Sequence, residues 1–196
     1  YTTLFRSELS AVLTDVLHVG SDVYVKPFLI GLPNRHNVLF DLQTNRLVGW
    51  WQGDVAHQRT QGKTWFWDVP EKSWMTIKGG ESQLQLQLAG RRLAPVVRGQ
   101  FVTELDQWQH IKGGIQFRRR LHFDTGSSEK LVVTVQERLT SLPANGQQSG
   151  WQRQLEVSGV PAGATLLVRV AEPEQLPGKK IDLASRQIDL LLEGGV

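Results

Sequence analysis

The amino-acid sequence predicts an all-β protein built as an antiparallel β-sandwich. Short apolar or alternating segments recur along the 196 residues, and turn-forming Gly, Pro and Asn residues separate them. No helix of ordinary length is predicted. Strands that follow one another without long helical crossovers favour antiparallel sheets packed face to face. We expect residues 1–196 to form a single β-sandwich domain, excised from a larger multidomain protein.

The strands are expected in the following order. Residues 4–19 fit a kinked strand about as well as a helix, and we interpret them as a strand because strands follow. The next strand covers residues 23–30, and Pro27 places it at a sheet edge or a bulge. Residues 53–62 and 141–150 are polar and are interpreted as surface loops. The remaining strands are expected at 36–41, 46–52, 63–69, 84–88, 96–105, 108–111, 115–123, 131–139, 151–157, 165–171 and 187–192.

Two of these strands form the clearest predicted hairpin, Ile115–Phe123 against Leu131–Leu139. Each strand carries one charged residue, Arg119 or Glu137, on its apolar face. If Phe123 lies opposite Leu131, these two side chains are diagonal neighbours within reach of each other. Because a lone buried charge is costly and a hydrogen-bonded pair is far less so, we expect Arg119 and Glu137 to pair.

An aromatic stretch dominates the middle of the chain and suggests the candidate site. Trp50 and Trp51 must point to opposite faces of their strand, as must Trp65 and Trp67 relative to Phe66. Two alternatives remain open, a strand pair covered on both faces or an exposed aromatic platform. A platform bordered by polar groups suits sugar rings. The candidate ligand-binding residues are therefore Trp50, Trp51, Asp54, His57, Trp65 and Trp67.

Other kinds of site have weaker support. The chain has no cysteine, no nucleotide-binding glycine loop and no nucleophile motif, so we expect no cofactor. The histidines show no metal-ligand spacing, and no metal is expected. Arg118, Arg120 and His122 form a row that suits an anion or a solvated sheet face. Carboxylate pairs for glycoside hydrolysis can be drawn from Asp41, Asp54, Asp68, Glu71, Glu104 and Asp106, without a spacing that selects one.

Charge and hydropathy exclude two classes of partner. The net charge is only +3 and the basic residues are dispersed, which does not indicate a nucleic-acid protein. No apolar run is long enough to cross a bilayer, so membrane insertion is not expected.

The segments Lys26–Pro33, Val38–Asp41 and Arg46–Gly53 together resemble a module of large bacterial extracytoplasmic proteins. Those proteins also carry a sorbosone-dehydrogenase-like propeller and a c-type cytochrome domain. The resemblance rests on a Leu-Pro turn, a strand ending in Phe-Asp, and a strand reading Arg-Leu followed by Trp and Gly. It covers about 30 residues, and this chain lacks the Cys-x-x-Cys-His haem motif. A looser resemblance is to galactose-mutarotase-like sandwiches.

These resemblances imply a non-catalytic accessory module for binding or scaffolding, in the periplasm or outside the cell. Its expected partners are neighbouring domains of the same polypeptide and, as a small ligand, carbohydrate. The mutarotase-like resemblance keeps a carbohydrate-active enzyme as the alternative, in which a carboxylate pair does the chemistry.

Overall fold

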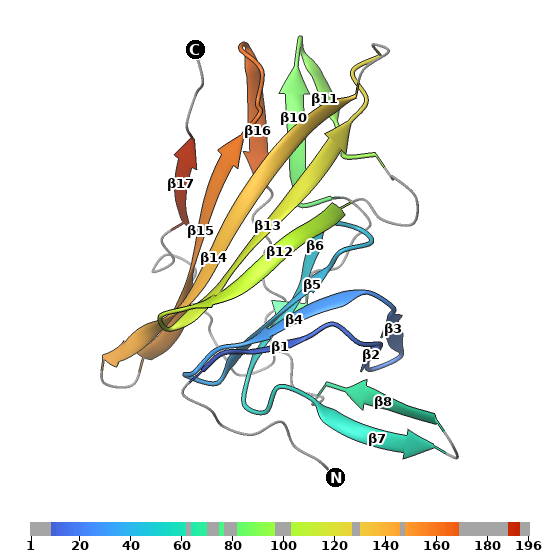
Figure 1. The fold of residues 1–196 in the computed structure, drawn as a ribbon, viewed down its shortest axis with the longest axis vertical. Coiled ribbons are helices and arrows are strands. Elements are labelled where there is room, and N and C mark those ends of the chain that lie inside the picture. Colours follow the sequence, from blue (N-terminus) through green and yellow to red (C-terminus); the bar gives the residue numbers. More distant parts are fainter. Residues whose placement is uncertain are drawn as a thin grey trace.

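The computed structural model describes residues 9–61, 64–69, 75–76, 82–96, 103–126, 130–145, 148–168 and 188–192. Within these ranges there is no helix, and the strands form four sheets, none of them closed into a barrel (Figure 1). Neighbouring strands pair antiparallel except for β2 with β8 and β15 with β17. The predicted all-β, sandwich-like fold is confirmed.

Two five-stranded sheets contain the longest strands. The first, the β4–β6 sheet, has the order β1 (Ala11–Leu13), β4 (Pro27–Gly31), β5 (His36–Asp41), β6 (Arg46–Gln52), β9 (Met75–Thr76). The second, the β12–β15 sheet, has the order β12 (Thr103–Ile111), β13 (Gly114–Phe123), β14 (Leu131–Asn145), β15 (Gln148–Ser158), β17 (Ile188–Leu192).

Two smaller sheets complete the described part of the fold. The β7–β8 sheet has the order β3 (Asp22–Tyr24), β2 (Leu17–Val19), β8 (Thr64–Asp68), β7 (His57–Gln61). The β10 sheet has the order β11 (Arg91–Leu93), β10 (Leu84–Leu88), β16 (Ala164–Val168).

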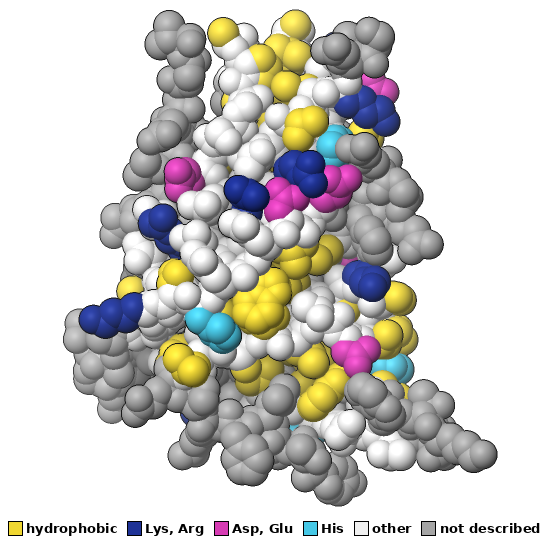
Figure 2. Space-filling view, in the orientation of Figure 1, with side chains coloured by type: hydrophobic (Ala, Val, Ile, Leu, Met, Phe, Trp, Pro, Cys, Tyr) yellow, Lys and Arg dark blue, Asp and Glu magenta, His cyan; other side chains and the backbone are white. Residues whose placement is uncertain are grey.

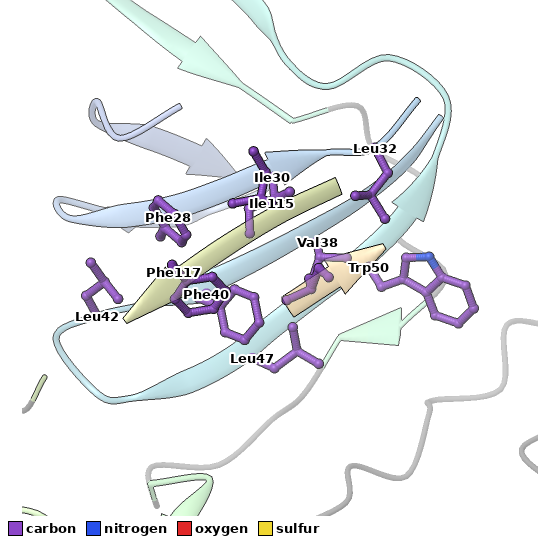
Figure 3. Close-up of a cluster of buried hydrophobic side chains, with 11 residues drawn as sticks. Phe28, Ile30, Leu32, Val38, Phe40, Leu42, Leu47, Trp50, Ile115 and Phe117 are labelled. Atoms are coloured by element: carbon purple, nitrogen blue, oxygen red, sulfur yellow. The ribbon is translucent and has the colours of Figure 1, made fainter. Parts of the chain in front are cut away.

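The inner face of the β12–β15 sheet is covered along its length by two different sheets. One half packs on the β4–β6 sheet and forms the Phe40 cluster, which contains Phe28, Ile30, Leu32, Val38, Phe40, Leu42, Leu47, Trp50, Ile115, Phe117 and Leu139 (Figure 3). The other half packs on the β10 sheet and forms the Val135 cluster, which contains Leu84, Leu86, Leu121, Phe123, Val133, Val135, Leu155 and Val157.

The opposite face of the β4–β6 sheet is also buried. It forms the Trp51 cluster, whose buried members are Leu17, Leu29, Leu39, Val48, Trp51, Ala56 and Val69. Since β2 and β8 contribute to this cluster, the β7–β8 sheet makes a third layer in this region. A sheet covered on both faces explains why all residues of β4 and β5 are buried.

A bulge in β6 decides which way the tryptophans point. The register with β5 shifts between the pairs Leu39–Gly49 and Phe40–Leu47, which leaves Val48 as the extra residue. An extra residue reverses the alternation beyond it. Leu47 and Trp50 therefore share the Phe40 cluster, whereas Val48 and Trp51 share the Trp51 cluster.

The hairpin prediction is confirmed residue by residue. Phe123 lies opposite Leu131, Phe117 lies opposite Glu137, and Arg119 lies opposite Val135. The hairpin of residues 36–41 and 46–52 also has the predicted bounds. The prediction that Pro27 marks an edge strand or a bulge is wrong, because β4 lies between β1 and β5 and has no bulge. Pro27 is instead the first residue of β4, where β1 does not yet pair and a missing N–H costs little.

Two predicted loops are wrong. Residues His57–Gln61 form β7, which pairs with β8, although their sequence is polar on both faces. The predicted loop at 141–150 belongs instead to the paired strands β14 and β15: β14 extends to Asn145 and β15 begins at Gln148. Asn34 supports this extension, because its side-chain amide donates to the carbonyl oxygens of Gly150 at 2.6 Å and Leu142 at 3.3 Å.

Other strand bounds differ in detail. The predicted strand 23–30 is divided between β3 and β4, which belong to different sheets. The predicted strands 96–105 and 108–111 are joined in β12, with a bulge between Leu105 and Gln107. Residues 1–8, 97–102, 169–171 and 177–178, on which parts of the predictions fall, lie outside the described residues.

Candidate functional site

Trp50 and Trp51 are core residues in the structure. Trp50 is 6% exposed and Trp51 1%, and they lie on opposite faces of β6. Of the two alternatives left open by the sequence, the strand covered on both faces is the one observed here. Neither ring is available as an exposed platform.

The Trp50 indole is tied to a buried histidine. Its Nε1 donates to Nδ1 of His36 at 2.9 Å, and the ring of Trp151 packs edge-on at 5.9 Å between centroids. Since His36 Nδ1 accepts this bond, the neutral imidazole carries its proton on Nε2. The bond satisfies two polar groups that would be costly to bury alone.

The Trp51 indole holds the loop that follows β6. Its Nε1 donates to the carbonyl oxygen of Asp54 at 2.9 Å. The buried Asn37 amide lies within hydrogen-bonding distance of the same oxygen at 3.3 Å and of the Gly53 carbonyl oxygen at 3.2 Å. Gly53 adopts a φ of 131°, which a residue with a side chain rarely adopts. These contacts fix the path of the chain from β6 to β7.

Asp54 and His57 lie on this loop and at its end. The Asp54 carboxylate faces Arg35 at 3.5 Å, and both side chains are about half exposed. A pair of this kind contributes at most about 1 kcal/mol. His57 is half-buried and begins β7. Trp67 is half-buried against the Trp51 cluster, and the side chain of Trp65 lies outside the described residues.

The outer face of the β7–β8 sheet, opposite the Trp51 cluster, brings together planar and charged side chains. We define the outer face by His18, His57, Arg59, Phe66 and Asp68. Strand register places them side by side: Asp68 lies opposite His18 on β2 and His57 on β7, and Arg59 lies opposite Phe66.

Two contacts on the outer face stack His18 and Arg59 on the Phe66 ring. The His18 ring lies 4.4 Å from the Phe66 ring at an interplanar angle of 27°, and the Arg59 guanidinium lies 4.4 Å from the Phe66 centroid. Arg59 also pairs with the Asp68 carboxylate, with Nε 2.5 Å from Oδ2. The positive charge of Arg59 is therefore balanced by the Asp68 carboxylate on the same face.

A second polar site lies inside the sandwich, between the Phe40 and Val135 clusters. Glu137 binds two guanidiniums, those of Arg119 and of Arg153, the latter with Nε at 2.8 Å. The predicted pairing of Arg119 with Glu137 is thus confirmed. Both residues are fully buried, with 1% and 0% of their side chains exposed.

Neighbouring sheets complete this buried network. Arg119 donates to the Asn45 side-chain oxygen in the turn between β5 and β6, and Arg153 Nη1 donates to Gln83 Oε1 at 3.0 Å just before β10. Asn45 in turn donates to Ser82 Oγ at 2.7 Å. The network therefore lies at the boundary between the β4–β6 sheet and the β10 sheet.

The buried charges shift each other's ionisation. Burial opposes the charged form of Glu137, but Arg119 and Arg153 outweigh it and hold the pKa of Glu137 below its ordinary value. Burial lowers the pKa of Arg119 from its ordinary value, against the attraction of Glu137. The network holds two cations and one anion, and all three side chains are buried.

The predicted row Arg118, Arg120 and His122 is occupied by carboxylates. Asp106 lies 2.8 Å from Arg120 and 3.4 Å from Arg118, and Glu104 lies 3.2 Å from Arg120 and 3.5 Å from His122. Figure 2 shows basic and acidic side chains side by side on this face. The row is therefore already neutralised within the protein.

Most of the remaining candidate carboxylates also have partners. The Asp41 carboxylate is buried and accepts from the Gln43 backbone N–H at 3.0 Å and from Thr44 Oγ1 at 2.6 Å. Glu71 lies outside the described residues. Among the described residues, no three His, Asp or Glu side chains are placed to hold a metal ion, and no helix is long and apolar enough to cross a membrane.

Sequence reasoning missed several of these residues. Arg153 had a detectable signal, because it is the charged member of the alternating inner face Trp151, Arg153, Leu155, Val157. No sequence signal marks His18, Arg59 or Phe66, since their stacking depends on which strands pair.

No protein-family model matches the chain, and neither a curated protein nor a solved structure matches it.

Proposed function

We propose that the chain is a non-catalytic accessory module that binds or scaffolds within a larger exported bacterial protein, and that its small ligand is a carbohydrate. The proposed ligand surface is the outer face of the β7–β8 sheet. The observation that carries the proposal is the stacked row of His18, Phe66 and Arg59, with Asp68 and His57 beside it.

The chemistry of this row suits a sugar. A sugar ring has apolar C–H faces, which pack on planar groups, and hydroxyls that both donate and accept hydrogen bonds. Arg59 supplies donors, Asp68 supplies acceptors, and imidazoles supply either. Asp54 lies on the loop that leads into β7.

The state of the carboxylates supports binding in preference to catalysis. Asp54 and Asp68 face arginines, Glu104 and Asp106 face the Arg118 row, and Asp41 accepts local hydrogen bonds. Each of these carboxylates is therefore already engaged by a partner within the protein.

A ligand titration with matched variants tests the proposal. The protein is titrated with a panel of oligosaccharides by isothermal calorimetry, and Phe66→Ala is compared with wild type. We expect at least a tenfold loss of affinity, because truncation removes the centre of the stack. Arg138→Ala is the control, since Arg138 is an exposed arginine on the β12–β15 sheet.

Equal affinities for wild type and Phe66→Ala would place any sugar site elsewhere. Absence of binding across the panel would overturn the carbohydrate proposal. Turnover of a sugar that is lost on replacing a single carboxylate would establish the enzyme alternative instead.

A further inference from the structure

β12 is the longest edge strand in the described part of the chain. It has nine residues and lies at the end of its sheet, whereas the other edge strands have two to five. A long edge strand presents unpaired backbone groups to any chain that approaches it. Natural proteins commonly protect such edges with charges, proline or bulges.

The protection of β12 covers only one end. The bulge at Asp106 and the charge of Glu104 lie in its first half. The second half, Gln107–Ile111, has no acidic or basic residue other than His110 and no proline. Trp108 is 41% exposed there, and its ring packs edge-on against the exposed His110 at 5.5 Å.

The hairpin of β12 and β13 determines which way the backbone N–H and C=O groups of Gln107–Ile111 point. Ile111 and Gly114 flank the two-residue turn between β12 and β13. Residues that flank such a turn bond each other, and the antiparallel alternation then directs the N–H and C=O groups of Trp108 and His110 away from β13. Both residues therefore present donors and acceptors to the free edge.

We propose that this edge pairs with the same edge of a second copy of the chain, antiparallel and with a two-fold axis at Gln109. In this register Trp108 lies opposite His110 of the partner subunit, and the outward backbone groups of both residues bond each other. The segment 107–111 ends at the bulge on one side and at the turn on the other, so Gln109 is its centre.

Side chains match in this register. Trp108 and His110 lie on the face that carries Phe117 and Ile115, so two aromatic pairs meet there across the axis. At each end of the paired segment, the bulge that carries the acidic Asp106 meets the turn of the partner subunit, which carries the exposed, basic Lys112. A two-fold contact of this kind is isologous and closes as a dimer.

Charge reversal at the axis tests the register. Gln109 is exposed, so we expect Gln109→Lys and Gln109→Glu to leave the monomer folded, which circular dichroism checks. Each variant places like charges opposite each other, and we expect each alone to sediment as a monomer at concentrations where wild type dimerises. An equimolar mixture of the two should restore the dimer.

A cysteine variant tests the same contact without relying on charge. The chain has no cysteine, so Gln109→Cys introduces one thiol at the axis, where Cα atoms of opposed residues lie within disulfide reach. Mild oxidation should give a disulfide dimer. Gln154→Cys, three strands away on the same outer face, is the control and should stay monomeric.

Wild type that sediments as a monomer throughout, with equal cross-linking at positions 109 and 154, would overturn the proposal. So would a wild-type dimer that Gln109→Lys leaves intact.

Discussion

Among individual residues that the structure describes, Arg119, Glu137 and Arg153 form a buried charged network in which each side chain depends on the others. Its three side chains come from adjacent strands, and their remaining bonds reach Asn45 and Gln83 in other sheets. A buried carboxylate between two guanidiniums is costly to form and more costly to break, because its removal leaves two buried cations without a counter-ion.

Glu137→Gln should therefore lower the free energy of unfolding by about 3–5 kcal/mol, measured by urea denaturation at pH 7. Glu156→Gln is the control, since Glu156 is only half-buried and bonds a neutral glutamine on the next strand. It should change stability by about 0.5 kcal/mol or less. A similar cost for both variants would contradict the role of the network.

The same residue gives a pH dependence. The folded pKa of Glu137 is below its ordinary value of 4.5, so the unfolded chain binds this proton at a higher pH than the folded chain does. The stability that ionised Glu137 contributes to the folded protein is complete above about pH 4.5 and is lost as the pH falls through the folded pKa. The stability difference between wild type and Glu137→Gln should thus shrink below pH 4.5. A difference that stays constant down to pH 3 would disprove the shift.

Trp50 offers a test of the core assignment. Trp50→Ala removes a buried indole and the hydrogen bond that it donates to His36 Nδ1, so we expect a loss of about 3–5 kcal/mol in unfolding free energy. Trp108→Ala, at an exposed position, should cost about 1 kcal/mol or less in dilute solution. Comparable melting temperatures for Trp50→Ala and wild type would place the ring at the surface.

At the element scale, the approach of β13 to β14 depends on a glycine. A Cβ at Gly114 would lie 1.8 Å from the Leu139 carbonyl oxygen, whereas one at Gly150 would meet only the end of the Leu142 side chain at 3.6 Å. Gly114→Ala should therefore cost about 3 kcal/mol or more, and Gly150→Ala about 1 kcal/mol or less, by thermal denaturation. Equal melting temperatures for the two variants would show that the strands separate easily here.

The elements also show how far the sequence predicts the structure. The β13–β14 register and the Arg119–Glu137 pair follow from alternation, since one buried face fixes which residues lie opposite each other. β7 was missed because His57–Gln61 has no apolar face, and it becomes a strand through pairing with β8. The outer face and the partners of Arg119 in other sheets depend on contacts between distant segments, which no local pattern records.

At the scale of the whole molecule, one long sheet is shared by two smaller cores. The β12–β15 sheet packs on the β4–β6 sheet at one half and on the β10 sheet at the other, and the buried network lies between them (Figure 1). Trp50 and Trp51 lie where the β4–β6 sheet is packed between the β12–β15 sheet and the β7–β8 sheet, and they belong to two different clusters. The β7–β8 sheet is the third layer there, and its outer face points away from the Trp51 cluster.

The proposed ligand site is the outer face of the β7–β8 sheet. The most direct measurement is a backbone-amide chemical-shift titration of the isotope-labelled protein with the best oligosaccharide of the panel. Binding at this face predicts saturable shifts at His18, Phe66, Asp68 and β7, with the amides of β13 and β14 unchanged. Saturable shifts confined to the β12–β15 sheet, or none at any sugar concentration, would contradict it.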